Sequence, residues 1–387
     1  MPTTETSKTL IPQNPLTSLY AVANIWERFV GTGELNHKHL RPVIADSWLR
    51  CRDLGINPLN NRARSVISEE EIEAKLHSEN LGISGKNVLD RMSNTVKDTG
   101  HVIVLADNLG RIIYSVGHKQ VRSHLDKINF RPGSEWSEKV VGPNGIGTPL
   151  AQGRPEVVMG SEHFCQGWQP WVCYGAPIHS PGNHSLLGCI DITGSANKIS
   201  VEAMALAISI TQSIESDLSV IQLKKREELR LIYHDIQMRF PNDASLLVDE
   251  YGYIIDVNSH ASSMFNTSSS IINKSINILA PELTTTINEC INNDEEREYE
   301  TMGEEQSLIA DMRLILKPIK TKKGALGCFI IIINKTSINI SAHNLRSNED
   351  ELIKKTLQQT NGNISKAAKI LDINRATIYR RRKNWLQ

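Results

Sequence analysis

Hydrophobic and polar residues recur in a pattern that predicts a first globular region over residues 40–195. Its first element is a short helix at 40–55, where Ile44, Trp48 and Cys51 recur at spacings of four and three residues. The later expected elements are a helix at 69–97, strands at 101–106 and 111–116, and strands at 171–178 and 185–192. This order fits an antiparallel sheet with helices on one side.

A long helix is expected over residues 200–240, because no Gly or Pro interrupts this stretch. Ala207, Ile214 and Ile221 recur at intervals of seven, and further apolar residues continue the same seam. Heptad spacing is typical of a coiled coil, so this helix is a candidate for holding two copies of the chain together. The alternative is a long helix that packs on its own domain.

A second, smaller globular region is expected at residues 242–335. A hairpin-like pair of strands at 245–248 and 253–257 opens it, helical and polar segments follow, and apolar strands at 312–319 and 327–333 close it. Residues 336–347 are polar without a clear period, which indicates a linker. The two globular regions together predict the α+β fold class.

The last segment, residues 348–387, has the spacing of three short helices. An amphipathic stretch at 349–359 ends before Gly362. Asn363 is a suitable N-cap for a second helix, and Asn374 is one for a third. Two short helices, a turn and a third helix form the layout of an all-α helix-turn-helix.

The distribution of charged residues also distinguishes the last segment from the rest of the chain. Lys+Arg and Asp+Glu both number 43 in the 387 residues, so the whole chain offers no bulk field that attracts polyanions. From Asn374 onward, however, the sequence holds five cations and no acidic residue. A cationic helix in a neutral protein indicates local contact with phosphates. The alternative is a basic helix that is solvated or binds an acidic partner.

Seven residues of the third helix are expected to contact DNA. Asn374, Arg375 and Thr377 lie at its N-terminus, the part that usually meets base edges in the major groove. Arginine can pair with guanine, and threonine can contact the methyl group of thymine. The other four residues are Tyr379, Arg380, Arg381 and Lys383.

These residues carry a specific resemblance. The segments 363–368 (NISKAA) and 374–381 (NRATIYRR) resemble the Fis-type helix-turn-helix, a module that closes many sigma-54-dependent activators. The resemblance implies sequence-specific binding to double-stranded DNA. Two positions depart from the module, because Asp372 stands where Gly is frequent and Arg382 where an apolar residue is common.

Residues 40–195 resemble the N-terminal region of the activators of acetoin and dihydroxyacetone catabolism, which implies a GAF domain. The matching motifs occur in order at Arg41–Ile44, Ser47–Trp48, Trp136–Glu138, Gly142–Thr148, Ser161–Phe164, Ala176–Ile178 and Leu187–Gly194. Residues 242–335 resemble a PAS domain more weakly, through Leu247–Gly252 and Val257–Asn258.

A glycine-rich segment of the first region is a candidate ligand site, because glycine lets the backbone approach a ligand closely. Seven residues are expected to enclose a small molecule: Trp136, Asn144, Gly145, Ile146, Gly147, Thr148 and Trp171. The alternative is that these glycines form turns and these tryptophans belong to the core.

A metal site and a redox active site are less well supported by the sequence. His163, Cys165, Cys173, His179 and His184 match no compact zinc pattern, so no metal or cofactor is expected. A GAF-type redox enzyme that uses Cys165, Cys173 or Cys189 is an alternative, but it leaves the C-terminal module unexplained. We therefore expect a regulator and no enzyme.

Activators of this resemblance normally carry an ATPase between the sensor and the DNA-binding module. Here only residues 336–347 separate the second globular region from the last segment, and the sequence contains no GxxxxGK[ST] phosphate loop. The chain is therefore expected to regulate without hydrolysing ATP. Its protein partners would then be RNA polymerase or a full-length sigma-54 activator.

Neither a secretory signal nor a membrane-spanning helix is expected from the sequence. Residues 1–12 lack a basic stretch followed by an apolar core, and the longest strongly apolar run, 328–333, is far shorter than the ~20 residues of a membrane helix. The sequence thus predicts a cytoplasmic homodimer, without membrane contact, that binds an inverted-repeat operator and a small-molecule effector. The competing class is a modulator of a full-length activator that does not itself bind DNA.

Overall fold

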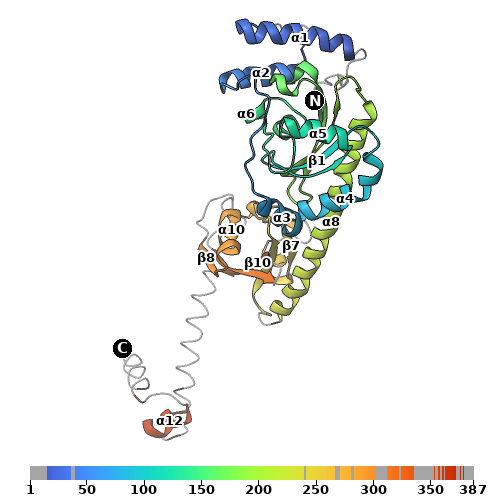
Figure 1. The fold of residues 1–387 in the computed structure, drawn as a ribbon. Helices are drawn as coiled ribbons and strands as arrows, with labels where there is room; N and C mark the ends of the chain where they lie inside the picture. Colours follow the sequence, from blue (N-terminus) through green and yellow to red (C-terminus); the bar gives the residue numbers. More distant parts are fainter. Residues whose placement is uncertain are drawn as a thin grey trace. The chain divides into compact units, whose positions relative to one another are not determined.

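The computed structural model describes most of the chain, which divides into two compact units, Met1–Lys224 and Lys225–Gln387 (Figure 1). The described residues are 15–35, 40–238, 241–265, 271–279, 283–300, 312–321 and 324–334, and in the last segment 353, 356–357, 360, 362–371, 375 and 378. None of the described helices has the length and apolar character needed to cross a membrane.

The first unit is built on a five-stranded antiparallel sheet with the strand order β2-β1-β5-β4-β3. Its strands are β1 (Val102–Asp107), β2 (Ile112–Gly117), β3 (Glu156–Met159), β4 (Trp171–His179) and β5 (Leu186–Ser195). In β1, which lies between β2 and β5, Val104 pairs with Ser115 of β2 and with Asp191 of β5. The four expected strands are confirmed, and β3 is an edge strand that the pattern analysis missed.

Helices cover both faces of this sheet, so the expectation of helices on one side only is wrong. The helices before α8 are α1 (Pro15–Thr32), α2 (Pro42–Asp53), α3 (Glu69–Ser78), α4 (Asn80–Val96), α5 (Lys119–Lys127), α6 (Glu138–Val141) and α7 (Gly147–Gln152), with short 3-10 turns η2 (Gly160–Glu162) and η3 (Gln166–Trp168). Val102 and Val104 pack with α1 and α2, whereas Ile103 and Leu105 pack with α4 and α8. Because all six residues of β1 are buried, both faces need a cover.

The helix expected at 69–97 is in fact two helices. Ser68 starts α3 with a capping box that it forms with Glu71. Glu79 then adopts an extended conformation (φ −90°, ψ 133°) and separates α3 from α4. Gly82 lets the start of α4 approach α3 closely, because a Cβ atom at this position would lie 2.1 Å from the carbonyl oxygen of Lys75.

The expected long helix is present as α8 (Val201–Gln237). Its heptad seam, however, packs within the chain, as in the alternative stated above. Ala207, Ile210, Ile214 and Leu218 are buried in the core of the first unit, and Ile214 is 0% exposed. The C-terminal part of α8 is buried in the second unit through Leu229 and Tyr233.

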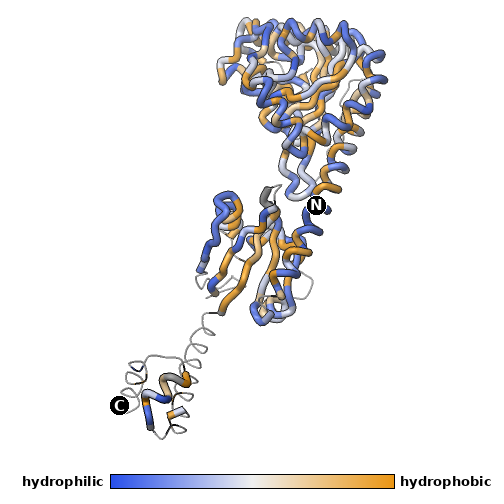
Figure 2. The backbone as a smooth tube through the Cα atoms, turned by 60° about the horizontal axis from the view of Figure 1, so that its bottom comes forward, coloured by the Kyte–Doolittle hydropathy of each residue, from blue (hydrophilic) through white to orange (hydrophobic). Residues whose placement is uncertain are grey.

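The second unit repeats the strand order of the first. Its antiparallel sheet has the order β7-β6-β10-β9-β8, and Figure 2 shows the hydrophobic residues concentrated along the strands of both sheets. The elements are β6 (Ala244–Asp249), β7 (Ile254–Val257), α9 (Ser259–Met264), η5 (Ile276–Ile278), α10 (Leu283–Asn293), β8 (Arg297–Glu300), β9 (Met312–Thr321) and β10 (Gly324–Asn334). The four expected strands and the α+β fold class are confirmed, whereas β8 was missed.

The last segment contains the described helix α12 (Ile364–Ile370). The side chain of Asn363 caps it by accepting a 3.0 Å hydrogen bond from the backbone N–H of Lys366, as expected. Ala367 and Ala368 are buried against Ile353 and Ile378, so this module has a small core of its own. The expected linker at 336–347 lies outside the described residues.

Candidate functional site

Asn144 ties down the glycine-rich segment of the first unit. Its Nδ2 donates to the carbonyl oxygens of Trp136 (3.0 Å) and Gly142 (2.9 Å). Its Oδ1 accepts from the N–H groups of Ile146 (2.8 Å) and Gly147 (3.0 Å). The side chain is 1% exposed, and all four bonds are made to the backbone of the protein itself. Asn144 therefore shapes this segment and has little hydrogen-bonding capacity left for a ligand.

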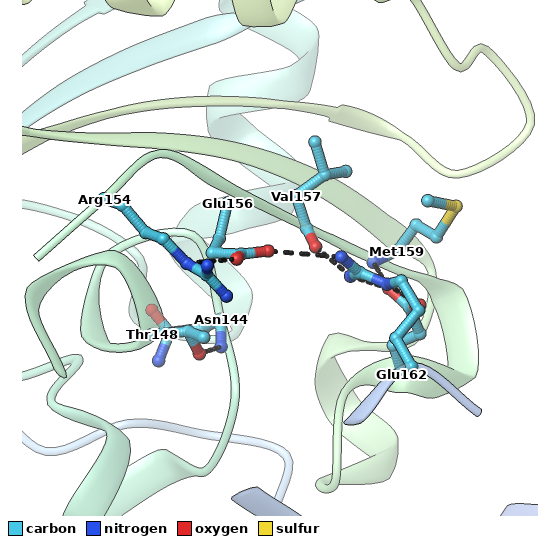
Figure 3. A network of polar contacts seen from close by, with 8 residues as sticks. Asn144, Thr148, Arg154, Glu156, Val157, Met159 and Glu162 are labelled. Atoms are coloured by element: carbon cyan, nitrogen blue, oxygen red, sulfur yellow. Dashed lines mark hydrogen bonds and ion pairs between the residues drawn. The ribbon is translucent and has the colours of Figure 1, made fainter. Parts of the chain in front are cut away.

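The glycines of the segment allow close packing. A Cβ atom at Gly145 would lie 2.0 Å from Oδ1 of Asp191, and one at Gly147 would lie 2.3 Å from the backbone nitrogen of Glu138. Ile146 is fully buried in the same core. Thr148 Oγ1 accepts the backbone N–H of Asn144 at 3.1 Å (Figure 3). These residues lie together, as expected, but they pack tightly against the rest of the first unit and support its fold.

The two predicted tryptophans belong to an aromatic cluster. Trp136 is 2% exposed, and its ring centroid lies 4.7 Å from that of Phe130 and 4.7 Å from that of Trp168. Trp171, at the start of β4, is partly buried against the same core. The space that these residues were expected to enclose is thus occupied by side chains of the protein.

A pocket of about 570 Å³ opens beside this segment. Of the seven predicted ligand residues, Gly147 alone lines it. The remaining lining comes from the β1–β2 turn, from the stretch before and within α6, from α7 and from Val66: Asn108, Leu109, Arg111, Glu135, Ser137, Glu138, Lys139, Leu150 and Ala151. The lining combines charged residues with apolar ones, and polar groups in a pocket can fix the orientation of a small molecule.

Glu138 is the most deeply buried charged residue of this pocket, with 8% of its surface exposed. Arg50 of α2 donates to its Oε1 from Nε at 3.0 Å and also from Nη2. Both bonds end on the same oxygen, and Oε2 has no hydrogen-bond partner among the described residues. The sequence analysis missed this pair, because its residues are 88 positions apart.

A second ion-pair network connects two motifs of the resemblance. Arg41 donates from Nε to Glu162 Oε1 at 2.8 Å and from Nη1 to Glu156 Oε2 at 3.2 Å. Glu156 also pairs with Arg154 at 3.2 Å (Figure 3). Trp48 Nε1 donates to the carbonyl oxygen of Glu162 at 2.8 Å. The network therefore holds α2 against β3 and η2, and it has a supporting role.

Helix α1 adds a further cover that the sequence analysis missed. Val22, Trp26 and Phe29 are buried in the core that also contains α2, and Trp26 Nε1 donates to the carbonyl oxygen of Phe164 at 2.8 Å. Their spacing of four and three residues is the helical signal that would have predicted α1.

Two buried ionisable residues lie apart from these networks. Asp191 is fully buried, and Thr193 donates to its Oδ2 at 2.5 Å, whereas Oδ1 has no partner among the described residues. Burial raises the pKa of Asp191 to about 7. His163 is also fully buried, and burial lowers its pKa to about 4.

The three candidate cysteines of the first unit do not have the environment of reactive thiols. Cys165, Cys173 and Cys189 are free and buried. Burial raises the pKa of Cys165 to about 12 and those of Cys173 and Cys189 well above the ordinary value. A thiol with a raised pKa holds little of the reactive thiolate at neutral pH. Among the described residues, no three His, Cys, Asp or Glu side chains gather as a metal site.

The candidate nucleic-acid interface is described at one of its seven predicted residues. Arg375 is exposed, and its Nη1 donates to Ser365 Oγ at 3.4 Å, while Ile378 three positions later is buried in the module's core. Arg375 is therefore on the solvent side of this module. The other six predicted residues lie outside the described part: Asn374, Thr377, Tyr379, Arg380, Arg381 and Lys383.

Comparison with known proteins adds two family matches. Residues 21–216 match the model described as "MimR, N-terminal domain", and residues 345–385 match "Bacterial regulatory protein, Fis family". The first match extends the resemblance of residues 40–195 across α1 and into α8. The second confirms the resemblance to the Fis-type module.

Two similar proteins are transcriptional activators by name. The chain is 33% identical over 206 residues to the acetoin dehydrogenase operon transcriptional activator AcoR of Bacillus subtilis, which covers 53% of this chain and 34% of AcoR. It is 28% identical over 216 residues to the propane 2-monooxygenase operon transcriptional activator MimR of Mycolicibacterium smegmatis, covering 56% of this chain and 36% of MimR. The matched part therefore spans only about a third of the length of these relatives.

Among solved structures, a crystal structure of the E. coli DhaR(N)–DhaL complex matches 76% of this chain and 99% of the matched chain. The sequence identity is 18% and the TM-score is 0.48.

Proposed function

This chain belongs to the family defined by the MimR N-terminal domain, and from this premise we propose that it is a DNA-binding transcription regulator. The C-terminal module carries the proposal. Asn363 caps α12, the small core around Ala367 orders the module, and Arg375 remains exposed beside it. This geometry and the match to the Fis family support a helix-turn-helix that presents cations to DNA.

The test uses an operator selected from random double-stranded DNA with the full chain. Arg375→Ala should weaken operator binding by roughly 1–3 kcal/mol, which is about 5- to 150-fold, and relax sequence preference. Lys320→Ala, which removes one cation from β9 in the second unit, is the matched control and should leave affinity unchanged. Unaltered operator affinity of Arg375→Ala in a gel-shift titration would remove the assignment. Failure to select any operator with the full chain would instead favour the competing class, a modulator that does not bind DNA.

We further propose that the first unit senses a small-molecule effector near the segment Asn144–Thr148. The support is the pocket beside Gly147, which borders the same segment. An effector that binds one of two arrangements of the protein more tightly by a few kcal/mol would change its DNA affinity correspondingly. In this proposal the residues of the segment transmit the change, and the pocket lining contacts the effector.

The proposed assembly is a homodimer formed through the exposed side of α8. Its seam residues are buried in the chain's own cores, but Val220, Leu223 and Leu231 are 49%, 65% and 62% exposed. These residues are the support for α8 as the contact between copies. A two-fold dimer would bind an inverted repeat with half-sites about one helical turn apart.

The proposed regulation proceeds without an ATPase in this chain. DNA occupancy would then act by blocking a promoter, by recruiting RNA polymerase, or by competing with a full-length sigma-54 activator for its sites. The support is the absence of a phosphate-loop motif from the 387 residues.

A further inference from the structure

Glu138 has a carboxylate that is only half satisfied. Both donors of Arg50 bind Oε1, and Oε2 has no hydrogen-bond partner among the described residues. The residue is 92% buried, since 8% of its surface is exposed, so water contributes little to its solvation. A buried charged oxygen without a donor is costly, and a ligand that supplies a donor would remove this cost.

Two cations line the pocket, Arg111 and Lys139, and neither donates a hydrogen bond to Glu138 Oε2. Arg111 donates from Nε to Asp107 Oδ2 at 2.8 Å, and Lys75 lies 3.6 Å from the same oxygen. The guanidinium group of Arg111 is therefore already paired with the carboxylate of Asp107. The carboxylate of Glu135 also lines the pocket, where it accepts a 2.8 Å hydrogen bond from Ser137 Oγ.

One part of the pocket lining suits a hydrocarbon group. Val66 and Leu109 are 44% and 57% exposed, and Leu150 of α7 lines the same pocket. A volume of about 570 Å³ accommodates a molecule of several non-hydrogen atoms. The pocket lining thus combines apolar side chains with Glu138, whose carboxylate is only half satisfied.

We propose that this pocket binds a small organic amine in its ammonium form. An N–H of the ammonium group donates to Glu138 Oε2, and the hydrocarbon part lies against Leu109 and Leu150. A charge-assisted hydrogen bond to a carboxylate is roughly twice as strong as a neutral one, so an amine is favoured over an alcohol of the same shape. The inference rests on the proposed sensor function and deepens it by naming the class of effector.

The test compares n-butylamine with 1-butanol, which have the same length and differ in the head group. Binding to the full chain is measured by isothermal titration at neutral pH, where the amine is protonated. We expect the amine to bind at least tenfold more tightly than the alcohol. Glu138→Gln should remove this preference, while Glu69→Gln, an exposed carboxylate of α3 outside the pocket, should leave it unchanged.

A second variant changes affinity in the opposite direction without altering Glu138. Arg50 has a side chain that is 46% exposed, so Arg50→Gln should fold, and circular dichroism checks this. Removing its charge leaves the carboxylate free for the ligand, and amine affinity should rise. Equal binding of amine and alcohol, no binding of the amine, or a preference that persists in folded Glu138→Gln would each overturn the inference.

Operator binding separates this inference from the proposed function. If the amine binds through Glu138 but operator affinity in a gel shift does not change, the pocket assignment stands and the sensor function fails. If operator binding depends on Arg375 but the amine does not bind, DNA-binding regulation stands and the amine assignment fails.

Discussion

Asn144 and Asp191 are both buried polar residues of the first unit, but only one of them has all of its hydrogen-bonding atoms paired. Asn144 makes four bonds to the backbone. Asp191 accepts from Thr193 through Oδ2 and has no partner for Oδ1 among the described residues. The first residue therefore stabilises the segment it belongs to, whereas the second makes stability depend on pH.

Asn144→Ala should lower the free energy of unfolding of the first unit by about 2–4 kcal/mol, because it leaves buried backbone groups without partners. Chemical denaturation followed by tryptophan fluorescence measures the change. Asn183→Ala is the control, since Asn183 accepts hydrogen bonds from Ser185 in an exposed turn and should contribute far less. Wild-type stability of the Asn144 variant would contradict its supporting role.

Asp191→Asn should stabilise the protein at pH 8 and lose this advantage as the pH falls towards 4. The folded protein holds the proton of Asp191 up to about pH 7, whereas an unfolded aspartate loses it near 3.8. Stability therefore falls as the pH rises between these values, by up to roughly 4 kcal/mol, and asparagine removes this fall. Unfolding titrations from pH 4 to 8 measure the difference between variant and wild type.

His163 opposes Asp191 in the same pH range. Its pKa falls from 6.5 to about 4 on burial, so its contribution is lost as the pH falls from 6.5 to about 4. The wild-type profile combines both slopes, and only the difference between Asp191→Asn and wild type isolates Asp191. Asp46→Asn, an exposed change on α2, is the control. A stability difference that stays constant across this range would refute the assignment.

At the scale of elements, α8 has two apolar surfaces with different environments. One surface, which includes Ile214, is buried in the chain's own cores. The other carries Val220, Leu223 and Leu231, which lie within about 80° of one another at 3.6 residues per turn. Such a helix covers a sheet of its own chain with one surface and leaves its other surface open to a partner.

A pair of substitutions distinguishes these surfaces. Ile214→Asp should destabilise the first unit by more than about 3 kcal/mol, because it places a charge in the core. Leu231→Asp, at a position that is 62% exposed, should leave stability nearly unchanged and shift the protein from dimer to monomer. Denaturation and light scattering measure the two effects. A Leu231 variant that remains dimeric would place the interface elsewhere.

At the scale of the whole molecule, charge is segregated along the sequence. The totals of 43 basic and 43 acidic residues cancel, while the segment after Asn374 contains only cations among its charged residues. DNA affinity would therefore come from one short module, and the rest of the chain would set when that module binds.

Purified protein should show no DNA-stimulated ATPase activity, because the chain lacks the phosphate loop that holds nucleotide phosphates. In a reconstituted system, a sigma-54 promoter should stay silent with this protein as sole regulator, and respond once a full-length activator is added. A phosphate-release assay and a transcription assay measure these outcomes. Transcription from that promoter without an added activator would refute a function based on binding alone.

The sequence by itself determined features that depend on neighbouring positions. Apolar runs bounded by turn residues predicted eight of the ten strands that the structure describes, and Asn363 as an N-cap residue predicted the capped helix of the last module. The concentration of cations after Asn374 is likewise a property of the sequence alone. Each of these signals is local, because a cap or a strand is specified within a few residues.

Only the tertiary structure decided which surfaces meet. The seam of α8 is equally apolar whether it packs on its own sheet or on a second copy, so its spacing could not distinguish them. The bond from Arg50 to Glu138 joins residues 88 positions apart, and that from Arg41 to Glu162 joins residues 121 apart. Long-range contacts arise when the chain folds, and sequence spacing does not encode them.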